Sequence, residues 1–123
     1  IGSRGDYRIS ANEVAIGLTM PRVAAAVLQH RLDPGAFQRA VTLSQEFDPA
    51  SALDAGFFDE LVGPEDLIAR AEALAGSFET LDARAHKTTK RRIRASLIRR
   101  IRLSLPLDLL DAVMMGLRGA RPR

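Results

Sequence analysis

Short apolar stretches separated by Pro, Gly and Asp divide the chain into a strand-like beginning and a series of helices. Residues 6–18 alternate in part between polar and apolar side chains, which predicts a strand region interrupted by Gly17. Pro21 predicts a helix start, because a proline at the first helical position loses no hydrogen bond. This helix is expected to continue through RVAAAVLQHR.

Two Asp-Pro pairs predict the starts of the next two helices, since Asp is a favoured N-cap and Pro suits the first helical turn. The pair at 33–34 predicts a helix over about 34–44. The pair at 48–49 predicts a shorter helix that ends at Gly56, a residue type that favours helix C-termini. The segment FFDELV after it is expected to be a short strand or extended piece.

The second half of the chain has the apolar spacing of helices. Apolar residues at intervals of three and four predict an amphipathic helix over 64–78. Asp82 is the expected N-cap of a longer basic helix that ends at about residue 104. Its apolar stripe consists of Ile93, Leu97, Ile101 and Leu105. After Pro106 an apolar segment over 107–115 precedes a tail that we expect to be disordered, GLRGARPR.

Composition limits the classes of protein that the chain can belong to. With 123 residues, 46% of them hydrophobic, it suits one globular domain or a large piece of one, able to bury about two thirds of its unfolded surface. The absence of cysteine excludes disulfides and Cys-ligated zinc or iron–sulfur sites, and fits the cytoplasmic location that we expect. No apolar run approaches the roughly 18 residues of a membrane span, so we expect no membrane partner. Because Ile1 rather than Met begins the sequence, we expect a fragment or a truncated product.

The net charge of +3 hides an asymmetry along the chain. Over residues 46–82 the charges are acidic except for Arg70, whereas over 87–102 they are all basic. The basic residues of this second run are Lys87, Lys90, Arg91, Arg92, Arg94, Arg99, Arg100 and Arg102. Such polarity indicates an anionic partner or pairing between parts of an assembly.

One carboxylate, Glu13, stands alone in the largely apolar run ISANEVAIGLTMP. A buried unpaired carboxylate is costly, so Glu13 either points to water or lies where its surroundings make use of it. The histidines suggest less. His30, near a helix end, is interpreted as a C-terminal capping cation. Neither it nor His86 has a second ligand at metal spacing, so we expect no metal site.

These motifs follow one another in a familiar order. Glu13 in NEVAIGL precedes the proline-started helix, and the segments FQRAVTLSQEFDPASALDAGFFDELV, PEDLIARAEALA and AHKTTKRRIRA follow. Over about residues 5–103 this order resembles the C-terminal half of the crotonase (enoyl-CoA hydratase/isomerase) superfamily. The resemblance implies an α/β fold class: a partial crotonase-type ββα spiral with one or two short strands, then a mostly α-helical region. It divides the chain into a core remnant (1–63), a helical trimerisation region (64–105) and a short apolar segment with its tail (106–123).

The resemblance implies an enzyme that acts on acyl-CoA thioesters, adding water across the 2,3-double bond or moving that bond. Glu13 falls on the acid/base position that hydratases and isomerases share, with Gly17 and Pro21 setting the backbone around it. Apolar neighbours, expected to be Ala11, Val14, Ala15 and Ile16, would bring the pKa of such a carboxylate towards working pH. The sequence has Asn12 where the family commonly has Pro, and TMPRVAAAV where it commonly has a Gly-rich turn.

By the same resemblance, the oxyanion hole and a first glutamate lie upstream of this half of the family's chain, so we expect the 123 residues alone to be inactive. No metal or redox cofactor is implied, because the thioester acidifies the α-proton and coenzyme A enters as part of the substrate. The complete protein is expected to be a homotrimer or a dimer of trimers. A non-catalytic assembly fragment is an alternative.

The basic helix allows three interpretations. It can be a packed helix with solvated Arg, or its cations, Lys90 and Arg91 first, can face the 3′-phosphate and pyrophosphate of CoA near a subunit boundary. Binding to nucleic acid phosphates is the third, and would be steeply salt-dependent. The helix has no aromatic residue for base stacking, which makes nucleic acid the least favoured of the three.

Overall fold

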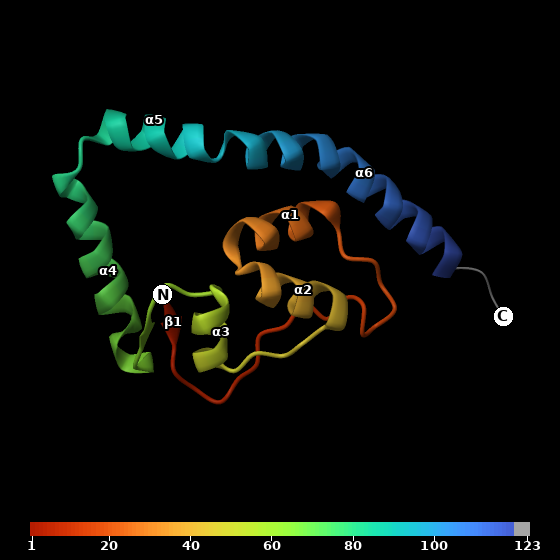
Figure 1. Cartoon of the computed structure of the whole chain (residues 1–123), viewed down its shortest axis with the longest axis horizontal. Helices are drawn as coiled ribbons and strands as arrows, with labels where there is room; N and C mark the ends of the chain where they lie inside the picture. The colour runs from red at the N-terminus through yellow and green to blue at the C-terminus, as the bar shows by residue number, and fades with distance from the viewer. Residues whose placement is uncertain (120–123) are drawn as a thin grey trace.

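The computed structural model describes residues 1–119 and consists of helices with one small sheet (Figure 1). The helices are α1 (Arg22–Arg31), α2 (Pro34–Leu43), α3 (Pro49–Ala55), α4 (Leu67–Ser77), α5 (Ala83–Ile93) and α6 (Ala95–Gly119). Two 3₁₀ turns, Pro64–Asp66 and Phe78–Thr80, flank α4. The strands are β1 (Gly2–Ser3) and β2 (Leu61–Val62). The expected α/β class with short strands and a mostly helical C-terminal region is confirmed.

The core lies among α1, α2 and α3. Phe47, which precedes α3, is 1% exposed, and its ring lies 5.3 Å from that of Phe57. The buried cluster around it consists of Leu32, Ala36, Ala40, Val41, Ala52 and Ala55. Most of these side chains are alanines, so the three helices approach one another closely around few large groups.

The predicted starts of α2 and α3 are confirmed, but Asp33 makes no side-chain cap, and Pro21 lies just before α1 and not at its first helical position. The Asp48 carboxylate accepts a hydrogen bond from the Ser51 N–H at 2.8 Å, which satisfies one of the free N–H groups of α3. Gly56 ends α3 with φ +92°, a left-handed conformation that glycine adopts without strain. An added Cβ there would also lie 3.0 Å from the Arg31 carbonyl oxygen. For α3, both the start at Asp48-Pro49 and the end at Gly56 are local signals, and both are confirmed.

The predicted strand over residues 6–18 is wrong. In this segment only Ile9 pairs with another strand-like residue, Phe47, through two N–H···O bonds of 2.9 Å. The sheet instead joins β1 to β2 in parallel, with Gly2 opposite Leu61. A strand requires a partner as well as an alternating pattern, and 6–18 has no ladder beside it. The expected extended piece in FFDELV is confirmed by β2.

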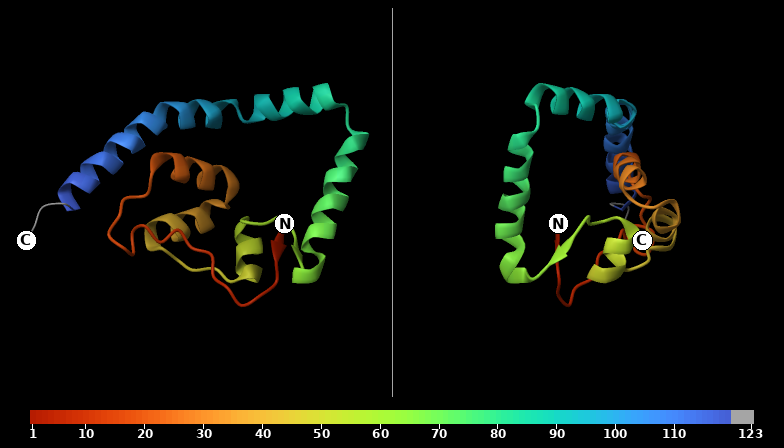
Figure 2. Two further views of the ribbon diagram at one scale, coloured as in Figure 1. Left: turned by 180° about the vertical axis from the view of Figure 1, so that it is seen from behind. Right: turned by 60° about the vertical axis from the view of Figure 1, so that its left-hand side comes forward.

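Helices α4, α5 and α6 form an open frame around the core (Figure 2). α4 leads away from the sheet, α5 turns back across, and α6 returns along α1, on which it packs. No residue of α4 is buried, and only Leu67 and Leu74 of its predicted apolar face are half-buried. In the described part of the chain, no helix combines the length and apolarity that a membrane crossing requires.

The predicted helix end at about residue 104 is wrong. The basic helix breaks instead at Arg94, between α5 and α6, and α6 then continues through Pro106. A proline inside a helix removes one backbone hydrogen bond, and contacts with another helix can compensate for that loss. Residues 116–119 of the tail predicted to be disordered are helical, and its last four residues lie outside the described part of the chain.

Candidate active site

Glu13 opens a tight turn over residues 13–17, called here the Glu13 turn. Its carbonyl oxygen accepts hydrogen bonds from the N–H groups of Ile16 at 3.2 Å and Leu18 at 2.7 Å. Its side chain is half-buried, and Oε2 is buried without a hydrogen-bond partner. A buried carboxylate oxygen that no protein donor satisfies is costly, so this atom is the clearest sign of a functional group in the described residues.

The apolar neighbours expected around Glu13 are only partly present. Ala11 is buried, whereas Val14 and Ile16 are 47% and 61% exposed and Ala15 is exposed as well. The turn directs these side chains outward, because its backbone curls instead of extending as a strand. The expectation that all four residues surround the carboxylate is therefore wrong for this structure.

Two residues hold the Glu13 turn in shape. The Ala15 N–H donates to Ser44 Oγ at 3.1 Å. Ser44 ends α2 in the left-handed region with φ +51°, and so brings its hydroxyl to the turn. Gly17 closes the turn with φ +79°, a conformation that L side chains rarely adopt. The predicted influence of Gly17 on the backbone is consistent with this φ.

Pro21 lines a cavity of about 540 Å³ between the entry to α1 and α6, called here the α6 pocket. Its lining consists of Thr19, Met20, Pro21, Arg22, Asp108, Asp111, Ala112, Met114 and Met115. Glu13 does not line it, so the structure places these two predicted site residues in adjacent segments and not in one cavity. An apolar wall with charges at one side can accommodate an apolar chain.

A cluster of charges joins α1 to α6 beside this pocket. Asp108 accepts hydrogen bonds from the backbone N–H groups of Arg22 at 2.9 Å and Val23 at 2.8 Å. The Arg22 guanidinium contacts Asp108 at 3.2 Å and Asp111 at 2.5 Å. The hydrogen bond from the Val23 N–H is the main cause that lowers the pKa of Asp108, and the contacts with Arg22 lower it further. The hydrogen bond to Asp111 is the main cause that raises the pKa of Arg22.

Arg22, Asp108 and Asp111 are not among the predicted site residues. The signal that singled out Glu13, a carboxylate in an apolar run, applies equally to Asp108 and Asp111 in LPLDLLDAV. Their partner Arg22 lies 86 residues earlier in the chain than Asp108, a separation that no local pattern reveals.

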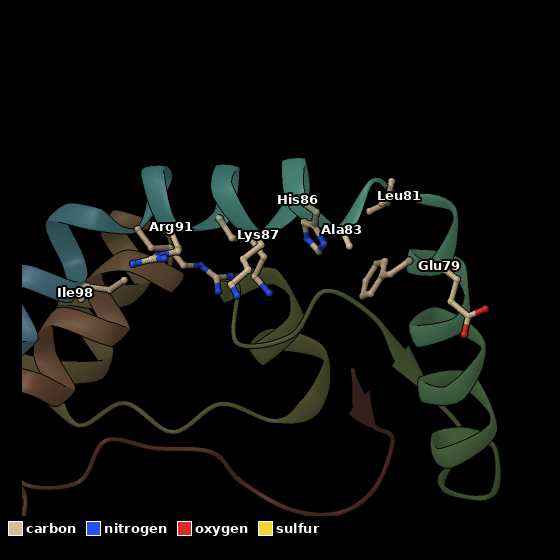
Figure 3. A pocket seen from close by; sticks show the side chains of 10 residues that line it. Glu79, Leu81, Ala83, His86, Lys87, Arg91 and Ile98 are labelled. Carbon is tan, nitrogen blue, oxygen red and sulfur yellow. The ribbon is translucent and has the colours of Figure 1, made fainter.

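Lys90 and Arg91 line a second cavity of about 620 Å³, called here the α5 pocket. Its lining consists of Phe78, Glu79, Leu81, Ala83, His86, Lys87, Lys90, Arg91, Arg94 and Ile98. Figure 3 shows His86, Lys87 and Arg91 on the same side of α5. The rings of Phe78 and His86 lie 6.1 Å apart. Four cations beside an apolar floor favour a ligand that carries both phosphate and a planar ring.

The structure brings Lys90 and Arg91 together but does not bring them to Glu13. The α5 pocket lies at the end of the frame next to α4, whereas the segment that enters α1 lies beside the far half of α6 (Figure 1). His30 lies exposed in the last turn of α1, and its role as a capping cation stays a prediction. Within residues 1–119, no three acidic or histidine side chains are grouped closely enough to hold a metal ion.

Comparison with solved structures gives strong matches. An enoyl-CoA hydratase from Mycobacterium marinum has a TM-score of 0.82 and 42% identity over 88% of this chain and 48% of that chain. A Mycobacterium tuberculosis protein matches with a TM-score of 0.83 and 40% identity over 88% of this chain and 48% of its own. That protein is described as an enoyl-CoA isomerase in one structure and as a probable enoyl-CoA hydratase in another.

Human mitochondrial Δ3-Δ2-enoyl-CoA isomerase shares the fold, with a TM-score of 0.83 and 24% identity over 93% of this chain and 45% of that one. The chain thus spans about half the length of the solved proteins it matches. No protein-family model and no curated protein sequence matches it.

Proposed function

Because this chain corresponds to the C-terminal half of the enoyl-CoA hydratase/isomerase (crotonase) family, we propose that Glu13 is the proton-transferring carboxylate of an enzyme that acts on acyl-CoA thioesters. The observation that carries the proposal is the buried Oε2 of Glu13, which has no protein partner in the described residues. A carboxylate oxygen left free by the protein is available to a substrate hydrogen or a water molecule.

The proposed chemistry is the transfer of one proton. In hydration, the water oxygen bonds to C3 of the enoyl group, and the carboxylate takes a proton from that water and delivers it to C2, so that Glu13 ends as the carboxylate it began as. In isomerisation, it removes a proton from C2 and a proton returns at C4, so the double bond moves by one position. Both reactions pass charge to the thioester oxygen, and neither needs a metal or redox cofactor, since the thioester carbonyl acidifies the proton at C2.

We further propose that this half of the fold is inactive alone. The family resemblance assigns the oxyanion-hole N–H groups to a segment that precedes this half. One such donor is typically worth about 10²–10³ in rate. Without donors for the thioester oxygen, removal of a proton by Glu13 would leave a negative charge on the substrate that nothing stabilises.

A fused protein tests the role of Glu13. The half of the Mycobacterium marinum enzyme that this chain does not match is placed before Ile1, and turnover of crotonyl-CoA and of a 3-enoyl-CoA is measured. We expect the Glu13→Gln variant to lose about 10²–10⁴ in kcat, the usual contribution of a general acid or base. The matched control is Glu46→Gln, which removes an exposed carboxylate.

Three results would contradict the proposals. Full turnover in the fused Glu13→Gln protein would exclude the carboxylate role. Turnover by the isolated chain that Glu13→Gln abolishes would contradict the expected inactivity. Equal losses in the Glu13 and Glu46 variants would show that the substitutions act through the fold.

For the other end of the substrate, we propose that Lys90 and Arg91 meet the phosphates of CoA. The supporting observation is their position in one cavity with Lys87 and Arg94, next to the Phe78 and His86 rings. Since this cavity is separate from the Glu13 turn in one chain, the cations of one copy would serve the Glu13 of another. This arrangement agrees with the trimer that the resemblance implies.

Binding of CoA tests this second proposal. The Lys90→Gln/Arg91→Gln variant is compared with Arg92→Gln/Arg99→Gln, which removes two cations that do not line the α5 pocket. We expect only the first variant to weaken CoA binding, and 3′-dephospho-CoA to bind more weakly than CoA. Equal losses in both variants would indicate a general effect of charge. Micromolar binding of duplex DNA at physiological salt would favour the nucleic acid alternative.

A further inference from the structure

The N-terminus of α1 is capped by a residue of another helix. The first N–H groups of a helix have no partner within it, and a side chain just before the helix usually accepts one of them. Here the preceding residue is Pro21, which makes no side-chain cap. Instead, the Asp108 carboxylate of α6 accepts hydrogen bonds from two of these N–H groups, those of Arg22 and Val23.

The Asp108 side chain is well placed for this task. It is 13% exposed, and its two oxygens are divided between the two donors: Oδ1 faces the Arg22 N–H and Oδ2 faces the Val23 N–H. The charged groups that face it are Arg22 from α1 and, through that guanidinium, Asp111 from α6. A carboxylate at a helix N-terminus is also stabilised by the helix dipole.

The cap acts on the segment that carries Glu13. Only residues 18–21 separate the Glu13 turn from the capped end of α1. The other fixed point is the bond from the Ala15 N–H to Ser44 Oγ. The turn is therefore held from α2 on one side and, through four residues, from α6 on the other.

We propose that Asp108 is a positioning residue that caps α1 from α6 and thereby sets the position of the Glu13 turn. Its catalytic consequence rests on the role proposed for Glu13, but its structural consequence does not. The placement of Glu13 thus depends on the Asp108 carboxylate that α6 brings to the start of α1. A displacement of about 1 Å in a catalytic group can cost about 10² in rate, so such a cap can matter without touching substrate.

Amide hydrogen exchange in the 123-residue chain tests the structural part. We expect Asp108→Ala to accelerate exchange at Arg22 and Val23 by about tenfold, in the range for loss of a helix cap, and to accelerate exchange within the Glu13 turn. Asp108→Asn, which keeps one acceptor oxygen, should restore part of the protection. Two controls should leave the turn unchanged. Asp111→Asn removes the ion pair with Arg22 but spares the cap, and Arg100→Gln removes a different link between α6 and α1, the 2.6 Å bond to Gln29.

Faster exchange at Arg22 and Val23 with an unchanged Glu13 turn would overturn the proposal, because the cap would then be local. An equal effect of Arg100→Gln on the turn would also overturn it, since seating of α6 by any contact would suffice. If Asp108→Ala unfolds, the test uses Asp108→Asn and the pH dependence of the original chain.

The pH dependence has a definite sign. Because the pKa of Asp108 is lowered in the fold, mainly by the Val23 N–H, protection of these amides should persist below the ordinary aspartate range and be lost as pH falls through the lowered value. Asp108→Asn should abolish this step, and Asp111→Asn should keep it. If Asp108→Asn lost protection over the same pH range, another group would be responsible for the loss, and the proposal would be overturned.

The fused protein provides the catalytic readout. Asp108→Ala should lower kcat by up to about 10², with KM little changed, and Asp108→Asn should recover part of the loss. Unchanged turnover together with faster exchange in the turn would reject the catalytic consequence alone. Loss of activity in Glu13→Gln tests the proposed function separately, so the two proposals can fail independently.

Discussion

Replacing Gly17 by Ala isolates a backbone effect at the end of the Glu13 turn. Gly17 has φ +79°, and an added Cβ would meet no atom within 4 Å, so steric clash with the surroundings contributes nothing. The cost is that of holding an L-residue in the left-handed region, about 1–2 kcal/mol. The smaller conformational freedom of alanine in the unfolded chain offsets about 0.4–1 kcal/mol of this. We therefore expect a net destabilisation of about 1 kcal/mol.

The control is the same substitution in a right-handed helix. Gly35 lies in α2, where an added Cβ would come within 3.3 Å only of Arg39 Nη1, the end of a flexible side chain. Gly35→Ala should stabilise the chain by about 0.5–1 kcal/mol, since alanine is the better helix former. Gly17→Asn should cost less than Gly17→Ala, because asparagine tolerates positive φ.

Urea unfolding followed by far-UV circular dichroism gives the free energy of each variant. The two alanine variants should shift the unfolding midpoint in opposite directions with unchanged slopes. A shift of both midpoints in the same direction would show that the positive φ of Gly17 is not what sets the cost of the substitution. A Gly17→Ala chain as stable as the original would show that the turn relaxes to another conformation.

Three further predictions concern the core, a cap and the assembly. Phe47→Ala removes a large side chain that is 1% exposed and should lower the free energy of unfolding by about 3–5 kcal/mol. The cooperative urea transition should then be lost, whereas a decrease of less than about 1 kcal/mol would show that the core does not depend on Phe47. Hydrogen bonds from the N–H and the hydroxyl of Ser51 lower the pKa of Asp48. The stability that Asp48 contributes should therefore persist below the ordinary aspartate range and be lost as pH falls through the lowered value. Thermal unfolding measured against pH should show this step, and Asp48→Asn should remove it. If the C-terminal helices form the trimer by themselves, light scattering of the chain should give about three times its mass of 13.4 kDa. The mass of a single chain would show that trimer formation needs the missing half of the fold.

Single candidate residues could be predicted where their signals are local, whereas their grouping in space could not. A lone carboxylate at position 13 in an apolar run indicated a special environment, and the structure gives it a buried oxygen without a partner. Lys90 and Arg91 stood out by charge, and they share a cavity because they are neighbours on one helix. The apolar surroundings expected for Glu13 failed, since a turn over 13–17 exposes side chains that a strand would have alternated.

Local signals predict where α1, α2 and α3 begin, because proline suits a helix start, and where α3 ends, because Gly56 adopts a positive φ without strain. No local pattern shows that β1 pairs with β2, that α6 continues through Pro106, or that Asp108 caps α1. The strand pairing and the cap join groups about 60 and 85 residues apart, and such groups meet through the packing of the whole chain and not through the preferences of any one segment.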